Sequence, residues 1–583
     1  MVALSVLTVA PMKFRTFIIP LALAAGLILV LGVGLLGGLA LRTPLYLLDR
    51  GGQAVPEALQ FVPRQSALVA SVLARPDRLA QLWDYLAEPK RRPSLRSDRE
   101  RLEQALLAQT GLTYDRDILP WLGEEITVAL VAPDVDQDPR NGITPGYLVA
   151  LSCRDDAKAQ ATLELFWQNR ALAGDPLTFE DLGGAPLIYG RGSASPSAVG
   201  VPPLATAVIA KRFVLVANDP SVLRQAIAAA QASDGSVKTD QRYKLALNAL
   251  PQSRIGLVAV NLPQVERWLH PELADTVLAQ APQLTESAPL GWGLVSLGLQ
   301  RQGVMAEAAW VVAPGHRLAP HQRQLTDWYP LARYLPGTLS LEALGLNLAD
   351  LESQLRSWLA PWVGSGEGLA LPQPSLEDRM GPGITGQILA SVDQAYALGL
   401  DLQANATPPH WLLASPSSLS TADLIDRLGR QASAYDLGSG RLDILGYPTT
   451  VWTRLSLRQG MPGRSDPLQV QTEVVGLSAE VGRDQVLTTS PAMMAQAIGV
   501  DQHQTLPPPW TEQIRTFPQA GESYVHLDWL PLADYLRQQV PQFRLWETIA
   551  YPILKHLGDM TLVSYGQTDQ VHRDSLLINL QNP

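Results

Sequence analysis

The pattern closest to a metal site is Asp134-Val-Asp136-Gln-Asp138, in which carboxylates alternate as they do at the start of a calcium-binding loop. Pro139 stands where such a loop needs its turn glycine, and no glutamate occupies the twelfth position. The pattern is therefore more typical of a solvated hairpin tip than of a calcium site, and we expect no metal ligands here.

Histidine and cysteine form no recognisable motif. His316 and His321 lack the four-residue spacing of two ligands on one helix face. Cys153 is the single cysteine, so no intrachain disulfide can form. The sequence also lacks a Gly-x-Ser-x-Gly elbow, a P-loop and a His-Glu-x-x-His helix. It therefore predicts no catalytic, cofactor-binding or metal-binding residues, and it favours a protein that is not an enzyme.

Two strings match the Gly-x-Gly-x-x-Gly fingerprint of dinucleotide-binding proteins. The first, Gly32 to Gly37, lies inside a long apolar stretch. The second, Gly381 to Gly386, runs into a predicted strand where the fingerprint requires a helix, so neither predicts a nucleotide site. Gly34 and Gly38 have the spacing that lets two membrane helices pack closely, which offers a route to self-association. The alternative is that glycine is simply common in such helices.

The elements that position any site begin with a membrane anchor. Residues 17–41 carry no charge, and at about 1.5 Å per residue a helix of that length spans roughly 37 Å, more than a hydrocarbon core of about 30 Å. No small-residue cleavage pattern closes the stretch. We expect a cytoplasmic N-terminus over 1–16, a single-pass anchor over 17–41, a linker over 42–60 and an extracytoplasmic body on the periplasmic side. Met12 is an alternative start that would exclude 1–11.

Composition indicates a folded body and excludes one class of partner. Hydrophobic residues make up 46% of the chain and charged residues 17%, which is enough apolar material for a large core. The formal net charge is -10 and the pI is about 5.4. Binding a phosphate backbone needs a concentrated cationic face, so we expect no nucleic-acid partner.

Two halves of the body repeat each other, because landmarks recur in the same order at nearly constant offsets. The paired landmarks are Val62-Pro63 with Leu335-Pro336, Leu122-Gly123 and Ile126 with Met380-Gly381 and Ile384, Tyr147–Ala150 with Trp411–Ala414, Leu182-Gly183 with Leu445-Gly446, Pro220 with Pro491, Gln225–Ile227 with Gln496–Ile498, Leu262-Pro263 with Leu530-Pro531, and Leu294–Ser296 with Leu562–Ser564. We therefore expect one lobe over 61–313, a joint over 314–333 and a second lobe over 334–583.

Each lobe is predicted to be α+β. Runs of apolar residues joined by short turns indicate mainly antiparallel strands, and segments such as 157–169 have helical spacing and would pack on the sheet. In the second lobe the pattern predicts a strand over 384–392 and a last strand over 575–580.

The landmarks Leu119-Pro-Trp-Leu-Gly123 and Phe213-Val-Leu-Val-Ala-Asn-Asp-Pro220, the latter leading into Gln225-Ala-Ile227, follow an anchored N-terminus. In these features the chain resembles a bacterial envelope family known as domain of unknown function 3352. The resemblance implies an anchored, exported protein. It brings no activity, cofactor or site residues with it.

Three classes of function remain open. The absence of a catalytic set on two tethered lobes favours a non-enzymatic binding, scaffold or assembly factor of the cell envelope, with an envelope protein as its partner. A carrier of an apolar ligand or lipid is the first alternative, and a hydrolase with an unrecognised site is the second. A binding protein would place its contacts on the paired irregular rims at 190–203 and 459–467.

Overall fold

The computed structural model describes residues 55–74, 112–135, 144–190, 203–269, 290–300, 303–337, 339–351, 384–402, 409–458, 469–503, 507–539, 547 and 557–580. The expected anchor, Gly34, Gly38, Asp136, Asp138 and most of both rims lie outside these residues. Within them, none of the helices has the length and apolar character needed to cross a membrane.

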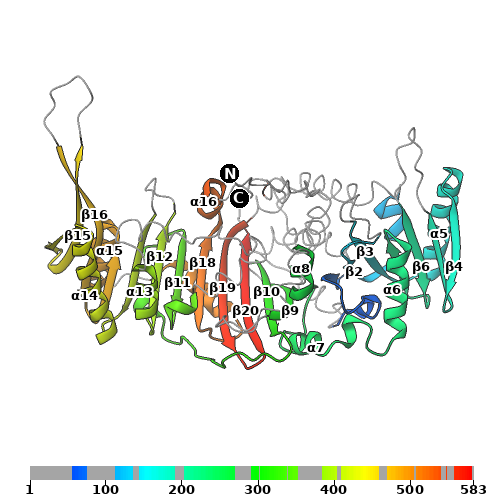
Figure 1. Cartoon of the computed structure of the whole chain (residues 1–583), viewed down its shortest axis with the longest axis horizontal. Coiled ribbons are helices and arrows are strands. Elements are labelled where there is room, and N and C mark those ends of the chain that lie inside the picture. Colours follow the sequence, from blue (N-terminus) through cyan, green and yellow to red (C-terminus); the bar gives the residue numbers. More distant parts are fainter. Residues whose placement is uncertain are drawn as a thin grey trace, which may run out of the picture.

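Twenty strands of the described residues form a single sheet, and every pairing in it is antiparallel. Its long axis runs across Figure 1, from β4 at one end to β14, β15 and β16 at the other. The order across the sheet is β4-β5-β6-β7-β3-β2-β1-β8-β9-β10-β20-β19-β18-β11-β12-β13-β17-β16-β15-β14. The mixed helix and antiparallel sheet architecture predicted from the sequence is confirmed.

The first half of the chain supplies ten of these strands. They are β1 (Leu68–Val72), β2 (Leu122–Ala132), β3 (Gly146–Cys153), β4 (Leu177–Leu182), β5 (Ala185–Gly190), β6 (Leu204–Ile209), β7 (Phe213–Ala217), β8 (Gly256–Asn261), β9 (Leu290–Leu299) and β10 (Gly303–Val312). The helical segments are η1 (Glu57–Phe61), η2 (Tyr114–Ile118), α5 (Asp156–Leu172), α6 (Pro220–Gln231), η3 (Val237–Thr239), α7 (Gln241–Asn248) and α8 (Leu262–Leu269).

The second half supplies the other ten. They are β11 (Leu341–Gly345), β12 (Tyr396–Asp401), β13 (His410–Pro416), β14 (Gly438–Ile444), β15 (Tyr447–Arg458), β16 (Gln469–Val481), β17 (Asp484–Thr488), β18 (Ser523–Asp528), β19 (Leu557–Gln567) and β20 (Val571–Leu580). The helical segments are α10 (Tyr329–Ala332), α13 (Ile384–Ser391), α14 (Leu419–Ala434), α15 (Pro491–His503), η5 (Pro509–Thr516) and α16 (Trp529–Gln539).

Both halves have the same strand order when each is followed from its outer edge to the middle of the sheet. Pro220 opens α6 directly after β7, and Pro491 opens α15 directly after β17. Asp219 caps α6 because its side chain accepts a hydrogen bond from the Ser221 amide at 2.7 Å. Local sequence therefore sets the same strand-to-helix turn in both places.

The two halves join where β10 pairs with β20. The register runs from Gly303 opposite Asn579 to Val311 opposite Val571, with Glu307 opposite Ser575. The core cluster of the first half includes Val571 of β20, and that of the second half includes Met305 of β10. Each core therefore takes a side chain from the other half, and we call this β10–β20 junction the seam.

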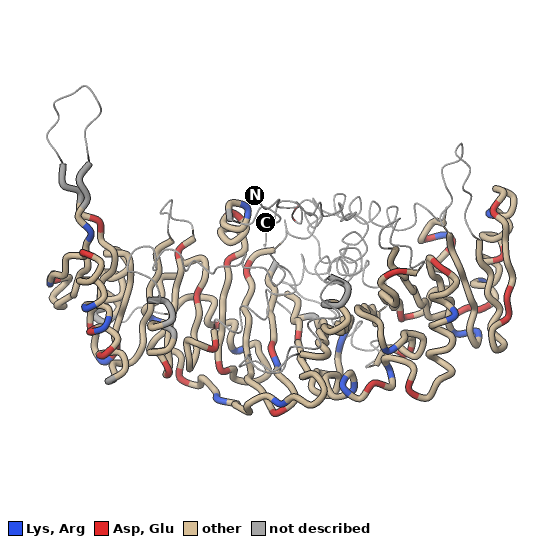
Figure 2. The backbone as a smooth tube through the Cα atoms, in the orientation of Figure 1, with Lys and Arg blue, Asp and Glu red and all other residues tan. Residues whose placement is uncertain are grey.

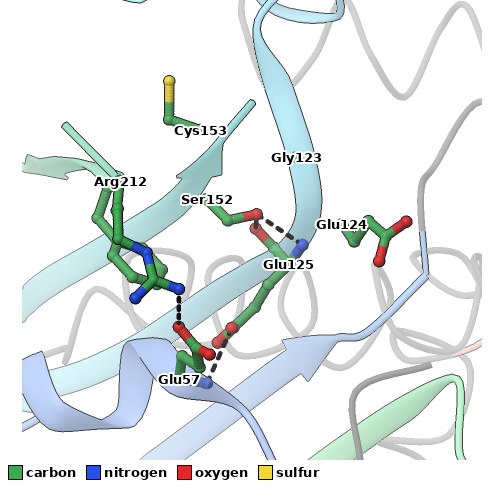
Figure 3. A pocket seen from close by; sticks show the side chains of 8 residues that line it. Glu57, Gly123, Glu124, Glu125, Ser152, Cys153 and Arg212 are labelled. Carbon is green, nitrogen blue, oxygen red and sulfur yellow. Dashed lines mark hydrogen bonds and ion pairs between the residues drawn. The ribbon is translucent and has the colours of Figure 1, made fainter. Parts of the chain in front are cut away.

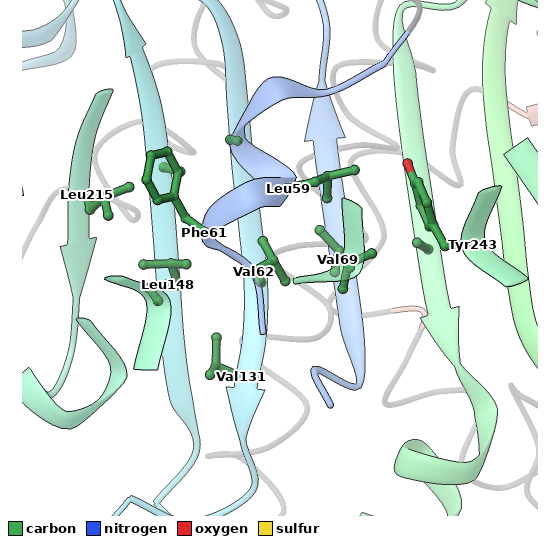
Figure 4. Close-up of a cluster of buried hydrophobic side chains, with 14 of the residues drawn as sticks. Leu59, Phe61, Val62, Val69, Val131, Leu148, Leu215 and Tyr243 are labelled. Carbon is green, nitrogen blue, oxygen red and sulfur yellow. The ribbon is translucent and has the colours of Figure 1, made fainter. Parts of the chain in front are cut away.

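Helices cover both faces of the sheet. Successive strand residues point to opposite faces, so Val69 joins the core under η1, α6 and α7 while Leu68 packs on the other side near α8. Figure 4 shows the first of these cores, with Leu59, Phe61 and Tyr243 lying over the strands. Acidic and basic residues are interspersed along the described backbone (Figure 2).

One predicted element is wrong. Residues 384–391 form the helix α13 rather than a strand. Ile388 and Val392 are buried, and the Gln387 side chain donates to Gln431 of α14 at 3.2 Å. A short apolar run fits a buried strand and a buried helix equally well, and here packing against α14 decides. The pairing of Ile126 with Ile384 therefore matched a strand residue with a helix residue.

Candidate functional site

A small hollow opens where β2 begins and β3 ends, beside η1 (Figure 3). Its volume is about 160 Å³, and its walls include Glu57, Glu125, Ser152, Cys153 and Arg212. Pockets for drug-sized ligands hold roughly 300–1,000 Å³, so this hollow is too small for one.

The carboxylate of Glu125 serves the fold rather than a reaction. It accepts hydrogen bonds from the backbone amides of Glu57 at 2.9 Å and Ala58 at 2.8 Å, and so caps the start of η1. Burial raises the pKa of Glu125 against these bonds. Burial also raises the pKa of the Cys153 thiol, which disfavours the nucleophilic thiolate.

A row of polar side chains crosses three neighbouring strands of the second half. Glu342 of β11 pairs with His526 of β18, and His526 pairs with Thr561 of β19. All three side chains face η5, and their exposed fractions are only 1%, 9% and 0%. Such groups are seldom fully buried without a structural or chemical role.

The hydrogen bonds of this row determine which group is the donor and which is the acceptor at each step. Gln513 of η5 donates through Nε2 to Asp559 at 3.2 Å, which turns its Oε1 toward Thr561. Thr561 donates to that oxygen at 2.7 Å, so its hydroxyl is left to accept from His526 Nδ1 at 3.0 Å. His526 therefore carries its proton on Nδ1 and leaves Nε2 as an acceptor. Asn579 also donates to Asp559, at 2.7 Å.

Trp510 of η5 lies against Glu342 and His526. Its indole N–H donates to the Glu342 carboxyl group. Its ring stacks on His526, with centroids 5.0 Å apart and planes only 2° from parallel. We call Glu342, Trp510, Gln513, His526, Asp559, Thr561 and Asn579 the polar cluster.

Burial keeps both titratable groups of the row neutral near pH 7. It raises the pKa of Glu342 to about 8. It lowers the pKa of His526 to about 4, against the attraction of Asp559, whose side chain is 32% exposed. The polar cluster thus contains a neutral Glu342 carboxyl group and a neutral His526 imidazole, both in contact with Trp510. Hydrogen bonds link His526 through Thr561 and Gln513 to the partly exposed Asp559.

The first half has an apolar core at the same places in the strand order. Val69 of β1 pairs with Ala259 of β8, and Ala259 pairs with Leu294 of β9. The residue in the first half and its counterpart in the second half are Val69 and Glu342, Ala259 and His526, Leu294 and Thr561, Trp292 and Asp559, Val311 and Asn579, Ala246 and Gln513, and Tyr243 and Trp510. The strand register thus matches Leu294 with Thr561, one residue away from the Leu562 with which the sequence landmark had paired it.

This one-sided replacement makes the polar cluster the candidate functional site. Burying polar groups costs free energy even when they are hydrogen-bonded, and the first half shows that the same architecture closes without them. Glu342 belongs to no motif that the sequence analysis recognises. The signal that could have found it is a position-by-position comparison of the two halves, in which the differences carry the information.

A family model described as a protein of unknown function, DUF3352, matches residues 22–580. The chain belongs to the DUF3352 family. The match includes both halves and all members of the polar cluster, and it agrees with the resemblance carried by the landmarks at 119–123 and 213–220.

Comparison with solved structures adds little to the family assignment. Two crystal forms of TP0453 are each 11% identical to this DUF3352 protein with a TM-score of 0.22. The similar region covers 45% of this chain and 81% or 82% of theirs. No match was found among curated proteins.

The residues singled out from sequence lie apart from the polar cluster. His316 is exposed, and His321 pairs with Glu522 at 2.8 Å, which raises the pKa of His321. Asp134 accepts from the Thr144 amide at 3.2 Å. Across the described ranges, no group of three or more His, Cys, Asp or Glu side chains could hold a metal ion.

His526→Phe should weaken the acid sensitivity of this DUF3352 protein. The pKa of His526 is lowered from 6.5 to about 4 in the folded state, so its contribution to stability is present above pH 6.5 and is lost as the pH falls toward 4. Phenylalanine keeps a flat ring against Trp510 but does not titrate. The melting temperature of the variant should therefore fall less than that of the natural protein between pH 6.5 and 4, and parallel curves would contradict this.

Proposed function

We propose that this DUF3352 protein is a membrane-anchored, extracytoplasmic binding or scaffold protein of the cell envelope. The observation that carries the proposal is the single twenty-stranded sheet of the described residues, which joins both halves in one long, continuous frame. At a spacing of about 4.8 Å per strand, such a sheet is on the order of 90 Å wide along its curve. A surface of that length suits simultaneous contact with several partners.

We further infer that the sheet arose by duplication of one ten-stranded unit. The shared strand order and the placement of Pro220 and Pro491 support this inference. The polar cluster would then be an acquisition of the second copy, or a loss from the first. In either case, the two halves would share one fold and differ in function at this place.

A carrier of an apolar ligand is the second candidate. A hollow of about 250 Å³ lies between the segment before α10 and η5, lined by Leu325, Thr326, Trp328, Ile514, Phe517, Gln519, Ala520 and Tyr524. It is smaller than the roughly 300–1,000 Å³ of pockets for drug-sized ligands, so it would hold only part of a lipid. Mass spectrometry of the protein released gently from membranes distinguishes the two proposals. A lipid retained in stoichiometric amount would favour the carrier, and protein partners without lipid would favour the scaffold.

The proposed anchor predicts where in the cell the protein is located. Because 17–41 carry no charge, we expect the protein to stay in the membrane fraction after alkaline carbonate extraction. A reporter fused after 583 should be active outside the cytoplasm only. Release by carbonate, or a reporter active only in the cytoplasm, would contradict the proposed location.

Partners are best identified by crosslinking in intact cells, followed by purification and mass spectrometry. A photoreactive residue at the exposed Leu442 or Phe179 samples the two ends of the sheet. Recurrent capture of the same envelope protein supports a scaffold. Absence of any protein adduct above that of a buried control position, such as Leu148, counts against it.

A further inference from the structure

Among the described residues, β4 and β14 are the two edge strands of the sheet, and each pairs with a described strand on one side only. Large apolar side chains are exposed at both ends, with Phe179 at 71% and Leu442 at 54%. In β14, Gly438 to Asp443 are all exposed. An uncovered edge strand presents unpaired backbone N–H and C=O groups that favour pairing with another strand.

The turn after β14 determines which backbone groups are free. Leu445 and Gly446 have φ values of 52° and 88°, as in a two-residue hairpin loop. Ile444 and Tyr447 close this hairpin as a directly hydrogen-bonded pair. Alternation along the strand then turns the backbone groups of Ser439, Arg441 and Asp443 outward, away from β15.

We propose that β14 pairs antiparallel with β14 of a second copy of this chain, with a two-fold axis at Leu442. In that register Arg441 of each copy lies opposite Asp443 of the other, and these are the residues whose backbone groups point outward. Shifting the axis to Arg441 puts arginine opposite arginine, and shifting it to Asp443 puts aspartate opposite aspartate. Like charges directly opposite are destabilising, so charge disfavours both of these registers. An axis at Gly440 would place Arg441 opposite the uncharged Ser439, so only the axis at Leu442 gives two attractive pairs.

Three observations favour a second copy as the occupant of this edge. The seam already joins two like edge strands in the same antiparallel way, with Glu307 opposite Ser575. Arg441 has no hydrogen-bond or ion-pair partner in the described part of the chain. Asp443 uses one oxygen to accept from the Gly446 amide at 2.9 Å, which leaves the other available.

The β4 edge lacks this self-complementarity. Its hairpin closes at Leu182 opposite Ala185, so Phe179 and Asp181 point their backbone groups outward. The only charge among those residues is negative, and a two-fold pairing cannot place an opposite charge against it. The β4 edge is therefore the matched control for β14.

The register is tested by disulfide formation between full-length chains in detergent micelles, with Cys153→Ser as background. Leu442→Cys should give a covalent dimer under mild oxidation, since directly opposed non-hydrogen-bonded residues have Cα atoms about 4.5 Å apart. Position 440 lies on the same face of the strand. In the Gly440→Cys variant the Cα atoms of the two substituted residues would be roughly 13 Å apart, which is too far for a disulfide, so this variant should not react. Equal crosslinking of the two variants overturns the proposal.

Charge exchange tests the same interface without a covalent bond. Arg441→Asp and Asp443→Arg should each weaken self-association about tenfold, because two attractive pairs become repulsive. The double variant restores opposite charges and should recover dimerisation. Failure of this rescue, when circular dichroism shows all variants folded, overturns the proposal. So does a dimer that survives the charge changes and is lost with Gly34→Leu, which would place self-association in the anchor.

Discussion

Trp510→Ala should lower the free energy of unfolding by roughly 3–5 kcal/mol, the usual cost of truncating a buried tryptophan. Trp510 is 6% exposed, stacks on His526 and donates to Glu342. Its removal opens a cavity and leaves the buried carboxyl group without this donor. Urea denaturation followed by circular dichroism measures the change.

Two phenylalanine variants separate the hydrogen bond from the ring. Trp510→Phe keeps a ring over His526 but loses the indole N–H, and should still cost about 1–3 kcal/mol. Tyr243→Phe, at the equivalent place in the first half, should be nearly neutral, because the Tyr243 hydroxyl has no hydrogen-bond partner among the described residues. Equal effects of the two variants would show that the polar cluster is energetically no different from the apolar core.

Glu342→Gln should make the protein more stable at pH 8 than at pH 5, relative to the natural chain. Burial raises the pKa of Glu342 from 4.5 to about 8. Its contribution to stability is thus fully present below pH 4.5 and is lost as the pH rises toward 8. At 1.36 kcal/mol per pKa unit the loss is on the order of 4 kcal/mol. Glutamine keeps an oxygen for the Trp510 indole and does not ionise.

The measurement is the difference in melting temperature between variant and natural protein at each pH. Glu512→Gln is the matched control, because Glu512 lies in η5, which covers Glu342, but its own side chain is exposed. The difference in melting temperature between Glu512→Gln and the natural protein should stay constant with pH. A constant difference for Glu342→Gln as well would show that the Glu342 carboxyl group ionises normally in the folded protein.

Much of the fold could be predicted because its signals are local. The apolar run in the strand Leu68–Val72 and the capped turn at Pro220 depend on residues that are neighbours in the chain. The strand order could not be predicted, since β1 lies between β2 and β8, which are far apart in sequence. Periodicity carries no information on which distant strand becomes a neighbour. The helix α13 was missed for the same reason, because its contact with α14 is tertiary.

The site was hidden because polar residues within apolar strands look like tolerated exceptions. Glu342 is the one polar side chain in β11, and His526 lies in β18, which also contains Ser523 and Asp528, so neither residue stands out alone. Only the pairing of β11 with β18 brings them side by side. A search for motifs finds residues that are close in sequence, whereas this cluster draws its members from four strands and a helical segment.

The seam can form only after nearly the whole chain has been synthesised. β10 ends at Val312 and its partner β20 begins at Val571, so the ribosome must add roughly 260 residues before the pairing can form. At about 5–20 residues per second, β10 waits for roughly 13 to 50 seconds. During that time the nascent first half has an open strand at each side. A chaperone that shields β10, or a slow translation of the second half, would therefore affect the yield of this protein more than that of one whose neighbouring strands follow each other directly.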